Sequence, residues 1–387
     1  MKLSIGIVGL PNVGKSTLFN ALLKKQVANV ANYPFCTIEP NVGIIEVPDE
    51  RLAVLAKIVN TSKIVPAAIE FYDIAGLVRG ASKGEGLGNK FLSHIREVEA
   101  IVHVVRLFED GNVVHVSDKI NPEDDIKTIE TELILADLET VNKFKEPKKG
   151  NASKKEDFET FEAVQKIKIE LDKGIPVRQM GLTDEELIAL KPLNLLTIKP
   201  VIYVFNVSED QLQDKDKTEI EIQTILKNLD SRFFFDRTQG KFRNDKTTPY
   251  HLPPTSFLYL CAKMEAEIVA FTPEEQKEYL MQFDLTESGL NRLIKKAYEI
   301  LGLISFLTAG EIEARAWTIK NGWLAPQAAG TIHTDFEKKF IKADIVKYED
   351  FVKCGGWVKA REQGLVQVTG KYYIMKDGDV VEFKIGA

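Results

Sequence analysis

A glycine-rich loop directly behind a short apolar run constrains this chain more than any other feature of its sequence. Residues 9–16 read Gly-Leu-Pro-Asn-Val-Gly-Lys-Ser and match the pattern G-x-x-x-x-G-K-[ST]. The run Leu3–Val8 predicts a buried parallel strand, and the leucine spacing of Ser16–Lys25 predicts a helix. A strand, a glycine loop and a helix in this order predict a phosphate-binding P-loop, because backbone N–H groups and the helix N-terminus point toward an anion.

Further apolar runs predict the rest of the domain that carries this loop. Ile69–Tyr72, Ala100–Val105 and Pro200–Phe205 each indicate a buried strand, and helical stretches lie between them. Strands that alternate with helices favour an α/β fold with a mostly parallel sheet. We therefore expect a P-loop nucleoside triphosphatase domain.

Two amphipathic stretches interrupt this alternation. Apolar residues recur at three- and four-residue steps over Asp125–Lys145 and again over Glu156–Lys173, and Glu146–Asn151 between them predicts a helix-stopping turn. We expect an antiparallel helical hairpin inserted between two strands. Its tip is basic, which fits either a solvated tip or a contact with RNA phosphates. The basic residues are Lys143, Lys145, Lys148, Lys149, Lys154 and Lys155.

The pattern changes again after about Leu303. Ala314–Ile319 predicts a strand, and Thr334–Lys342 predicts a short helix. Near the end, Tyr372–Met375 and Val380–Ile385 are apolar runs with Asp377-Gly378 between them, a strong signal for a β-hairpin. These features predict a small, separate α+β domain.

Composition bounds the classes of protein to consider. A length of 387 residues predicts two or three domains at roughly 150 residues each. The net charge of −6 disfavours nucleic-acid binding by bulk charge but leaves room for a local basic patch. Three distant cysteines match no metal-ligand spacing and favour reduced thiols, and no apolar run is long enough to span a bilayer. Because Leu3–Val8 runs directly into the P-loop, we expect no signal peptide. We expect a soluble, cytoplasmic protein. The cysteines are Cys36, Cys261 and Cys354.

The P-loop predicts how a triphosphate and its metal are held. Lys15 is expected to reach the β- and γ-phosphates, and the Ser16 hydroxyl is expected to bind Mg²⁺. Asp73-Ile74-Ala75-Gly76 follows the strand Ile69–Tyr72, so Asp73 can hold Mg²⁺ through water and Gly76 can donate its N–H to the γ-phosphate. The predicted nucleotide contacts on this side are Asn12, Val13, Gly14, Lys15, Ser16 and Thr17.

Two loops are expected to respond to the γ-phosphate. Thr37, in the loop Tyr33–Asn41, is the candidate for binding both Mg²⁺ and the γ-phosphate, and Gly80–Gly88 contains four glycines that suit a mobile switch. Ras-like proteins orient the attacking water with a glutamine directly after D-x-x-G. Here that position is Leu77, which has no hydrogen-bonding group, so another group must position the water.

In combination these motifs identify a family. The chain resembles the Obg-like ATPases, the YchF subfamily of the Obg group of P-loop switch proteins, over nearly its whole length. The resemblance implies a nucleotide domain at 1–124 and 194–303, a coiled-coil hairpin at 125–193, and a TGS domain with a β-grasp fold at 304–387. It also implies ATP hydrolysis and association with the ribosome. The residues that carry it are Gly9–Ser16, Asn32–Asn41, Asp73–Gly88, Asn206–Glu209 and the segment from about Ile304.

The same resemblance agrees with an apolar residue at position 77 and leaves two candidates for positioning water. One is K⁺ held by Asn12, since an asparagine at this place of the P-loop is associated with potassium use in related families. The other is His115, which follows the predicted strand at 101–106. His94 and His103 are weaker candidates, because they fall within a predicted helix and a predicted strand. Lys15, Thr37, Gly76 and His115 are thus the predicted catalytic residues.

The base-binding loop favours ATP over GTP. GTPases read guanine with N-K-x-D, whose Asp accepts two hydrogen bonds from the base, but here the strand at 201–205 is followed by Asn206-Val207-Ser208-Glu209. Glu is one methylene longer than Asp and cannot keep the same two-pronged geometry, whereas adenine never benefited from that carboxylate. The predicted contacts with the base are Asn206, Val207, Glu209, Cys261, Ala262 and Lys263.

Three alternatives to an ATP-hydrolysing switch are open at this point. An Obg-type GTPase would bind GTP more tightly than ATP. A binding module would use ATP as a structural clamp and contact RNA or protein through the hairpin or the TGS domain. A metabolic kinase is disfavoured, because a small-molecule kinase has no need of a γ-phosphate sensor such as D-x-x-G.

Overall fold

The computed structural model describes residues 3–26, 41–74, 87–109, 120–147, 155–229, 235–236, 241–242 and 256–386. The chain divides into two compact units. The first contains residues 1–25, 37–43 and 70–293, and the second contains residues 26–36, 44–69 and 294–387. The division into three domains that the sequence predicts stays a prediction.

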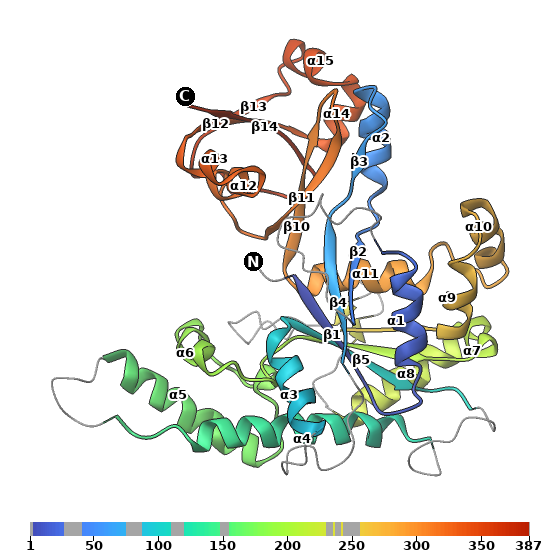
Figure 1. Cartoon of the computed structure of the whole chain (residues 1–387), viewed down its shortest axis with the longest axis vertical. Helices are drawn as coiled ribbons and strands as arrows, with labels where there is room; N and C mark the ends of the chain where they lie inside the picture. The colour runs from blue at the N-terminus through green and yellow to red at the C-terminus, as the bar shows by residue number, and fades with distance from the viewer. Residues whose placement is uncertain are drawn as a thin grey trace. The chain divides into compact units, whose positions relative to one another are not determined.

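The P-loop follows the central strand of a six-stranded sheet (Figure 1). The strand order is β2-β4-β1-β5-β6-β9, and the pairs β4–β1, β1–β5, β5–β6 and β6–β9 are all parallel. Every residue of β1, β5 and β6 is buried, as expected of parallel strands covered on both faces. The predicted α/β fold is confirmed. The strands are β1 (Ser4–Val8), β2 (Val42–Glu46), β4 (Ala68–Asp73), β5 (Ala100–Arg106), β6 (Val201–Asn206) and β9 (Ser256–Leu260).

Helices connect these strands and carry most of the remaining chain of the first unit. The α-helices are α1 (Lys15–Leu23), α3 (Leu87–Glu97), α4 (Pro122–Asn142), α5 (Lys155–Asp172), α6 (Asp184–Leu190), α7 (Glu209–Gln213), α8 (Lys215–Leu229), α9 (Ala262–Ile268) and α10 (Pro273–Met281), and α11 (Gly289–Ile300) begins there. In the described part of this unit, 3₁₀ turns lie at Val177–Gln179 and Lys191–Leu193, and the short strands β7 (Phe235–Asp236) and β8 (Lys241–Phe242) pair antiparallel.

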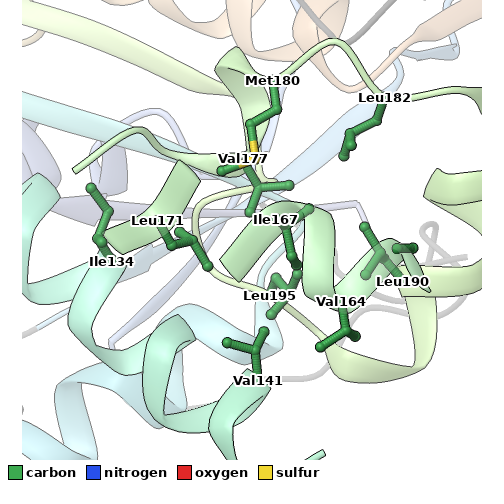
Figure 2. Packing of buried hydrophobic residues seen from close by; sticks show 11 residues of the cluster. Ile134, Val141, Val164, Ile167, Leu171, Val177, Met180, Leu182, Leu190 and Leu195 are labelled. Atoms are coloured by element: carbon green, nitrogen blue, oxygen red, sulfur yellow. The ribbon is translucent and has the colours of Figure 1, made fainter. Parts of the chain in front are cut away.

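The predicted helical hairpin is formed by α4 and α5, which share a buried apolar cluster (Figure 2). Figure 2 shows Ile134 of α4 beside Leu171 near the end of α5, and Val141 near the end of α4 on the side of Val164. Within this cluster the earlier residue of α4 thus meets the later residue of α5, and the later residue of α4 lies toward the earlier residue of α5, so the two helices run antiparallel. The apolar residues recur at the three- and four-residue steps from which the hairpin was predicted.

A buried carboxylate joins this hairpin to the chain that returns to the sheet. Asp137 of α4 is fully buried and accepts hydrogen bonds from the backbone N–H groups of Leu196 and Thr197, both at 2.8 Å. The hydroxyl of Thr197 donates a third bond at 2.6 Å. Burial raises the pKa of Asp137, and the hydrogen bonds from Thr197 and Leu196 oppose that rise. Three donors on one carboxylate compensate for its removal from water.

The second unit is built around a β-grasp. Its sheet has the order β13-β12-β14-β10-β11-β3, in which β10 and β11 form an antiparallel hairpin and β14 lies parallel to β10. The helix α12 covers one face of the sheet through a cluster that includes Phe306, Ala329 and Ile345. The elements are α2 (Glu50–Ile58), β3 (Ile64–Val65), β10 (Leu303–Ala309), β11 (Ala314–Lys320), α12 (Ala325–Ile332), α13 (Thr334–Lys338), β12 (Phe340–Lys347), α14 (Tyr348–Cys354), α15 (Trp357–Glu362), β13 (Gln367–Thr369) and β14 (Asp379–Ile385).

The predicted hairpin at Asp377-Gly378 is wrong. Ile374 forms an isolated antiparallel bridge with Leu324, whereas β14 pairs with β12 and β10. A turn does form, with Gly378 at φ 79°, but it is anchored on β10: the Asp377 Oδ1 accepts from the N–H of Ser305 at 2.9 Å, and the N–H of Gly378 donates to the Ser305 carbonyl at 2.8 Å. Tertiary hydrogen bonds therefore lead β14 into the middle of the sheet.

The predicted helix over Thr334–Lys342 is too long. The helix α13 ends at Lys338, and Phe340 begins β12, where it pairs with Ile385 and its side chain is buried in the core. The burial of Phe340 in the sheet overrides the local helical pattern. Within the described parts of the chain, every helix is too short or too polar to span a bilayer.

Candidate nucleotide-binding site

The P-loop leaves β1 and wraps back over the start of α1. Asn12 and Gly14 have φ angles of 64° and 100°, a left-handed conformation that glycine adopts without strain. A Cβ at Gly14 would lie 2.3 Å from the Asn206 amide nitrogen, and a Cβ at Gly9 would lie 2.6 Å from the Val104 carbonyl oxygen. Both glycines are therefore required by close approach, and they let the backbone curve tightly enough to surround an anion.

Lys15 is the first residue of α1, and its side chain folds back into the loop. Its Nζ donates to the carbonyl oxygens of Gly9 at 2.7 Å and of Leu10 at 2.8 Å, and the residue is 8 % exposed. Burial lowers the pKa of Lys15 to about 8, although the nearby Asp73 carboxylate acts in the opposite direction. The loop thus holds its one cation against its own carbonyl groups, where phosphate oxygens would supply stronger partners.

Asp73 ends β4 on the same edge of the sheet. In the parallel pairing of β4 with β1, Asp73 lies opposite Ile7. Ile7 is two residues before Gly9, where the P-loop begins. Burial raises the pKa of the Asp73 carboxyl, and Lys15 opposes that rise. The ends of parallel strands bring side chains from distant segments to one edge, which is where ligands of such sheets bind.

The Ser16 hydroxyl, predicted to bind Mg²⁺ together with Asp73, lies at the start of α1 beside Thr17, a predicted nucleotide contact. Ser16 and Thr17 are both exposed. Among the described residues no three His, Cys, Asp or Glu side chains converge to hold a metal. A P-loop Mg²⁺ is held by one hydroxyl, a carboxylate and phosphate oxygens, so its protein ligands are expected to be few.

Among the residues discussed for the nucleotide site, Thr37, Gly76, Leu77 and His115 lie outside the described residues. Their predicted roles stay predictions. His103, the weaker candidate in β5, is described and is 2 % exposed, with its ring 5.5 Å from that of Tyr203. Burial lowers the pKa of His103 to about 4, so it is a neutral residue of the core near neutral pH.

Asn206 joins the two halves of the candidate site. The residue ends β6 and is 5 % exposed. Its amide nitrogen donates to the carbonyl of Val13 in the P-loop at 3.0 Å, and its amide oxygen accepts from the backbone N–H of Ala262 at 2.9 Å. The structure therefore brings the predicted base loop to the P-loop through a single side chain.

The remaining residues of the predicted base loop differ in exposure. Val207 is 1 % exposed, so its side chain supports the loop from within and offers little surface to a base. Ser208 caps α7 by accepting from the N–H of Gln211, so Glu209 falls in the first turn of that helix. The carboxylate of Glu209 lies 3.5 Å from the ammonium of the exposed Lys263, which raises the pKa of Lys263.

Cys261 and Ala262 are buried behind this pair. Cys261 precedes α9, and burial raises the pKa of its thiol. One residue of importance was not predicted. Glu265, one turn into α9, is completely buried and contacts the start of α11, and the only hint in the sequence is an acidic residue on the apolar side of a short helix.

Comparison with known proteins agrees with this geometry. A family model described as 50S ribosome-binding GTPase matches residues 4–143. A model of the YchF GTPase C-terminal family, described as protein of unknown function (DUF933), matches residues 303–386.

Individual relatives match over almost the whole chain. The ribosome-binding ATPase YchF of Bacillus subtilis is 49% identical over 386 residues, and that of Haemophilus influenzae is 46% identical over 388 residues, each covering 99% of both chains. A solved structure, the Schizosaccharomyces pombe YchF GTPase, is 36% identical with a TM-score of 0.83 and covers 99% of this chain and 98% of its own. This chain belongs to the YchF family.

Proposed function

We propose that this chain is an ATP-hydrolysing switch protein that associates with the ribosome. The bacterial relatives that share 49% and 46% of its residues carry the name ribosome-binding ATPase. The P-loop, with Lys15 buried inside it and Asp73 on the same sheet edge, supports triphosphate binding and hydrolysis. A ribosomal partner implies a cytoplasmic location. The helical hairpin or the β-grasp is the surface that we expect to contact RNA.

The observation that carries the preference for ATP is the pairing of Glu209 with Lys263. In a guanine-reading loop the equivalent carboxylate is free to accept hydrogen bonds from N1–H and the 2-amino group. Here it begins a helix and faces an ammonium at 3.5 Å, while the lysine that would cover the base is replaced by the buried Val207. Charge-assisted hydrogen bonds contribute about 1.5–3 kcal/mol each, so guanine loses selective binding and adenine does not.

Adenine still needs an acceptor for its 6-amino group. The amide oxygen of Asn206 already accepts from the N–H of Ala262, which leaves it one lone pair. A backbone carbonyl of the base loop or this remaining lone pair can therefore serve adenine.

Residues of the P-loop edge fit Mg²⁺, the cofactor that we propose. Ser16 and Asp73 provide the hard oxygen donors that this ion prefers, and Thr37 is the predicted third ligand. Bound Mg²⁺ would neutralise charge that develops on the phosphates. Lys15, released from the carbonyls of Gly9 and Leu10, would pair with the β- and γ-phosphates and stabilise the charge that grows on the bridging oxygen.

The water-positioning group is either K⁺ at Asn12 or His115. Asn12 lies exposed at the top of the P-loop in a left-handed conformation. If K⁺ is used, exchange of K⁺ for Na⁺ should slow hydrolysis, and Asn12→Ala should remove the difference. If His115 is used instead, His115→Ala should slow a single turnover while the affinity for ATP stays nearly unchanged.

Calorimetric titration of ATP and GTP into the same protein tests the proposed base preference. We expect ATP to bind several-fold more tightly than GTP, both in the micromolar range (about −8 kcal/mol). Hydrolysis of both nucleotides is then measured with and without ribosomes. Tighter binding of GTP would replace this proposal with an Obg-type GTPase, and turnover that ribosomes leave unchanged would favour a binding module that uses ATP as a clamp.

A further inference from the structure

The segment Cys261–Lys263, which is predicted to contact the base together with Asn206–Glu209, is held in place by a carboxylate that belongs to no nucleotide motif. Glu265 lies one turn beyond Ala262 in α9, and its exposed fraction is 0 %. Its Oε1 accepts a hydrogen bond from the backbone N–H of Gly289 at 2.5 Å, and its Oε2 accepts one from the N–H of Leu290 at 3.2 Å. One side chain thus binds the first two N–H groups of α11.

These two N–H groups require a partner. The first turn of a helix leaves its N–H groups without acceptors inside the helix, and the positive end of the helix dipole favours an anion there. The next N–H, that of Asn291, donates to the hydroxyl of Ser288 at 3.2 Å. Without Glu265, two buried donors would be left unsatisfied, which costs more than losing a hydrogen bond at the surface. The contact between α9 and α11 is therefore firmly set.

Close packing at Gly289 strengthens this contact. A Cβ at position 289 would lie 2.6 Å from the Cβ of Leu260 and 2.7 Å from the Oε1 of Glu265. Leu260 is the last residue of β9, directly before the loop Cys261–Lys263. Ala262 and Lys263 are the first residues of α9, so the start of α11 packs against the residue before Cys261–Lys263 and against Glu265 in the helix that this segment begins.

The helix that carries the P-loop reaches the same junction. At the end of α1, the Nζ of Lys24 donates to the carbonyl of Ala266 at 3.0 Å, and the Nζ of Lys25 donates to the Oδ1 of Asn291 at 2.7 Å. Burial lowers the pKa of Lys25, whereas Glu265 acts to raise it. The end of α1 and the start of α11 both meet the middle of α9 around Glu265, so this junction fixes Cys261–Lys263 relative to the P-loop helix.

We propose that Glu265 is a positioning residue for the nucleotide base: it holds Cys261–Lys263 in place and thereby sets how tightly the base is bound. The inference rests on the proposed nucleotide-binding function. Glu265 is buried behind the loop and acts on the base through α9. A ligand without a base, such as inorganic tripolyphosphate, uses the P-loop alone, so its affinity should not depend on Glu265.

The variant Glu265→Gln tests this role. It keeps the shape of the side chain, removes its charge and places an NH₂ group against a backbone donor. Dissociation constants are measured by calorimetry for ATP and for tripolyphosphate, both with Mg²⁺. We expect the constant for ATP to rise about tenfold and that for tripolyphosphate to stay within about twofold of the unsubstituted protein.

A matched control lies on the same helix. Glu267→Gln removes the same charge from an exposed position of α9, and we expect it to leave both dissociation constants within about twofold. Gly289→Ala provides an independent test, because it displaces the loop by steric contact while Glu265 keeps its charge. It should weaken ATP selectively as well, and it decides the question if Glu265→Gln does not fold.

Two results would overturn the proposal. Equal losses of affinity for ATP and for tripolyphosphate would make Glu265 a general stabiliser of the first unit. Unchanged ATP affinity in both variants would show that Cys261–Lys263 keeps its position without Glu265. Failure of the proposed function looks different, because the unsubstituted protein itself would then bind ATP no more tightly than tripolyphosphate.

Discussion

The two sides of the candidate site are built in different ways. The phosphate side is one continuous stretch, Gly9–Ser16, shaped by glycines and by the start of α1. The base side is assembled from β6, the loop before α9 and the start of α11, and buried side chains hold these segments together. A continuous loop depends on few outside contacts, whereas an assembled surface depends on each of its connections. The two sides should therefore respond to different substitutions.

Loss of Lys15 should have the largest effect, and it should act on the phosphate side alone. Lys15→Ala removes the cation that faces the bridging oxygen, and electrostatic contributions of this kind are worth about 3 kcal/mol or more in the transition state. We expect hydrolysis to be abolished and the binding of both ATP and tripolyphosphate to weaken strongly. Single-turnover kinetics and calorimetry provide the measurements, and normal turnover would remove the P-loop assignment.

Asn206→Ala should affect the phosphate side and the base side together, because Asn206 connects them. The variant leaves the carbonyl of Val13 and the N–H of Ala262 without their partner, at a cost of about 1–3 kcal/mol for a buried group. We expect weaker binding of ATP and of tripolyphosphate together with a lower melting temperature. Thermal unfolding followed by calorimetry checks this expectation. Loss of ATP binding alone would place Asn206 on the base side only.

Raising the pH should weaken the phosphate side through Lys15. Its pKa is lowered to about 8 in the free protein, so the ammonium is charged below that value and loses its proton above it. Phosphates require the charged form, and affinity should therefore fall by about tenfold per pH unit well above pH 8. Titrations at pH 7, 8 and 9.5 measure this, and binding above pH 8 should take up a proton from the buffer. An affinity that is flat up to pH 9.5 would contradict the lowered pKa.

The smallest expected effect concerns base choice alone. Val207→Lys combined with Glu209→Asp restores the residues of a guanine-reading loop, and we expect the ratio of ATP to GTP affinity to move toward GTP by about fivefold, roughly 1 kcal/mol. The gain in GTP affinity is limited because Val207 is buried, so the charged end of a lysine at this position has to reach solvent past the residues that cover Val207. Competition titrations against a fluorescent nucleotide measure the ratio, with tripolyphosphate as the control that should not change. An unchanged ratio would remove the role given to Glu209 and Val207.

Features that depend on neighbouring residues were predictable from the sequence. The buried strands, the P-loop and the antiparallel hairpin of α4 and α5 follow from apolar periods and glycine spacing, and the structure confirms all three. The hairpin predicted at Asp377-Gly378 is wrong although a turn does form there. Hydrogen bonds to Ser305, far away in the sequence, anchor this turn on β10, so β14 does not pair with the segment directly before the turn.

The connections of the base side could not be predicted for the same physical reason. Asn206 bonds to residues 193 and 56 positions away, and Glu265 bonds to a residue 24 positions away. No local pattern encodes these pairs, because they arise only when three elements pack together. The segments Asn206–Glu209 and Cys261–Lys263 could be found from the sequence, but the side chains that hold them in place could not.

The place of β14 in its sheet has a consequence for how the protein is made. This strand follows β10, β11 and β12 in sequence, yet it lies between β12 and β10 and joins the two halves of the β-grasp. During synthesis the hairpin of β10 and β11 emerges well before residues 379–385. Until those residues emerge, the edge of β10 that pairs with β14 has no partner strand. We therefore expect this sheet to be completed only after β14 has left the exit tunnel, and the uncovered edge to favour chaperone binding until then.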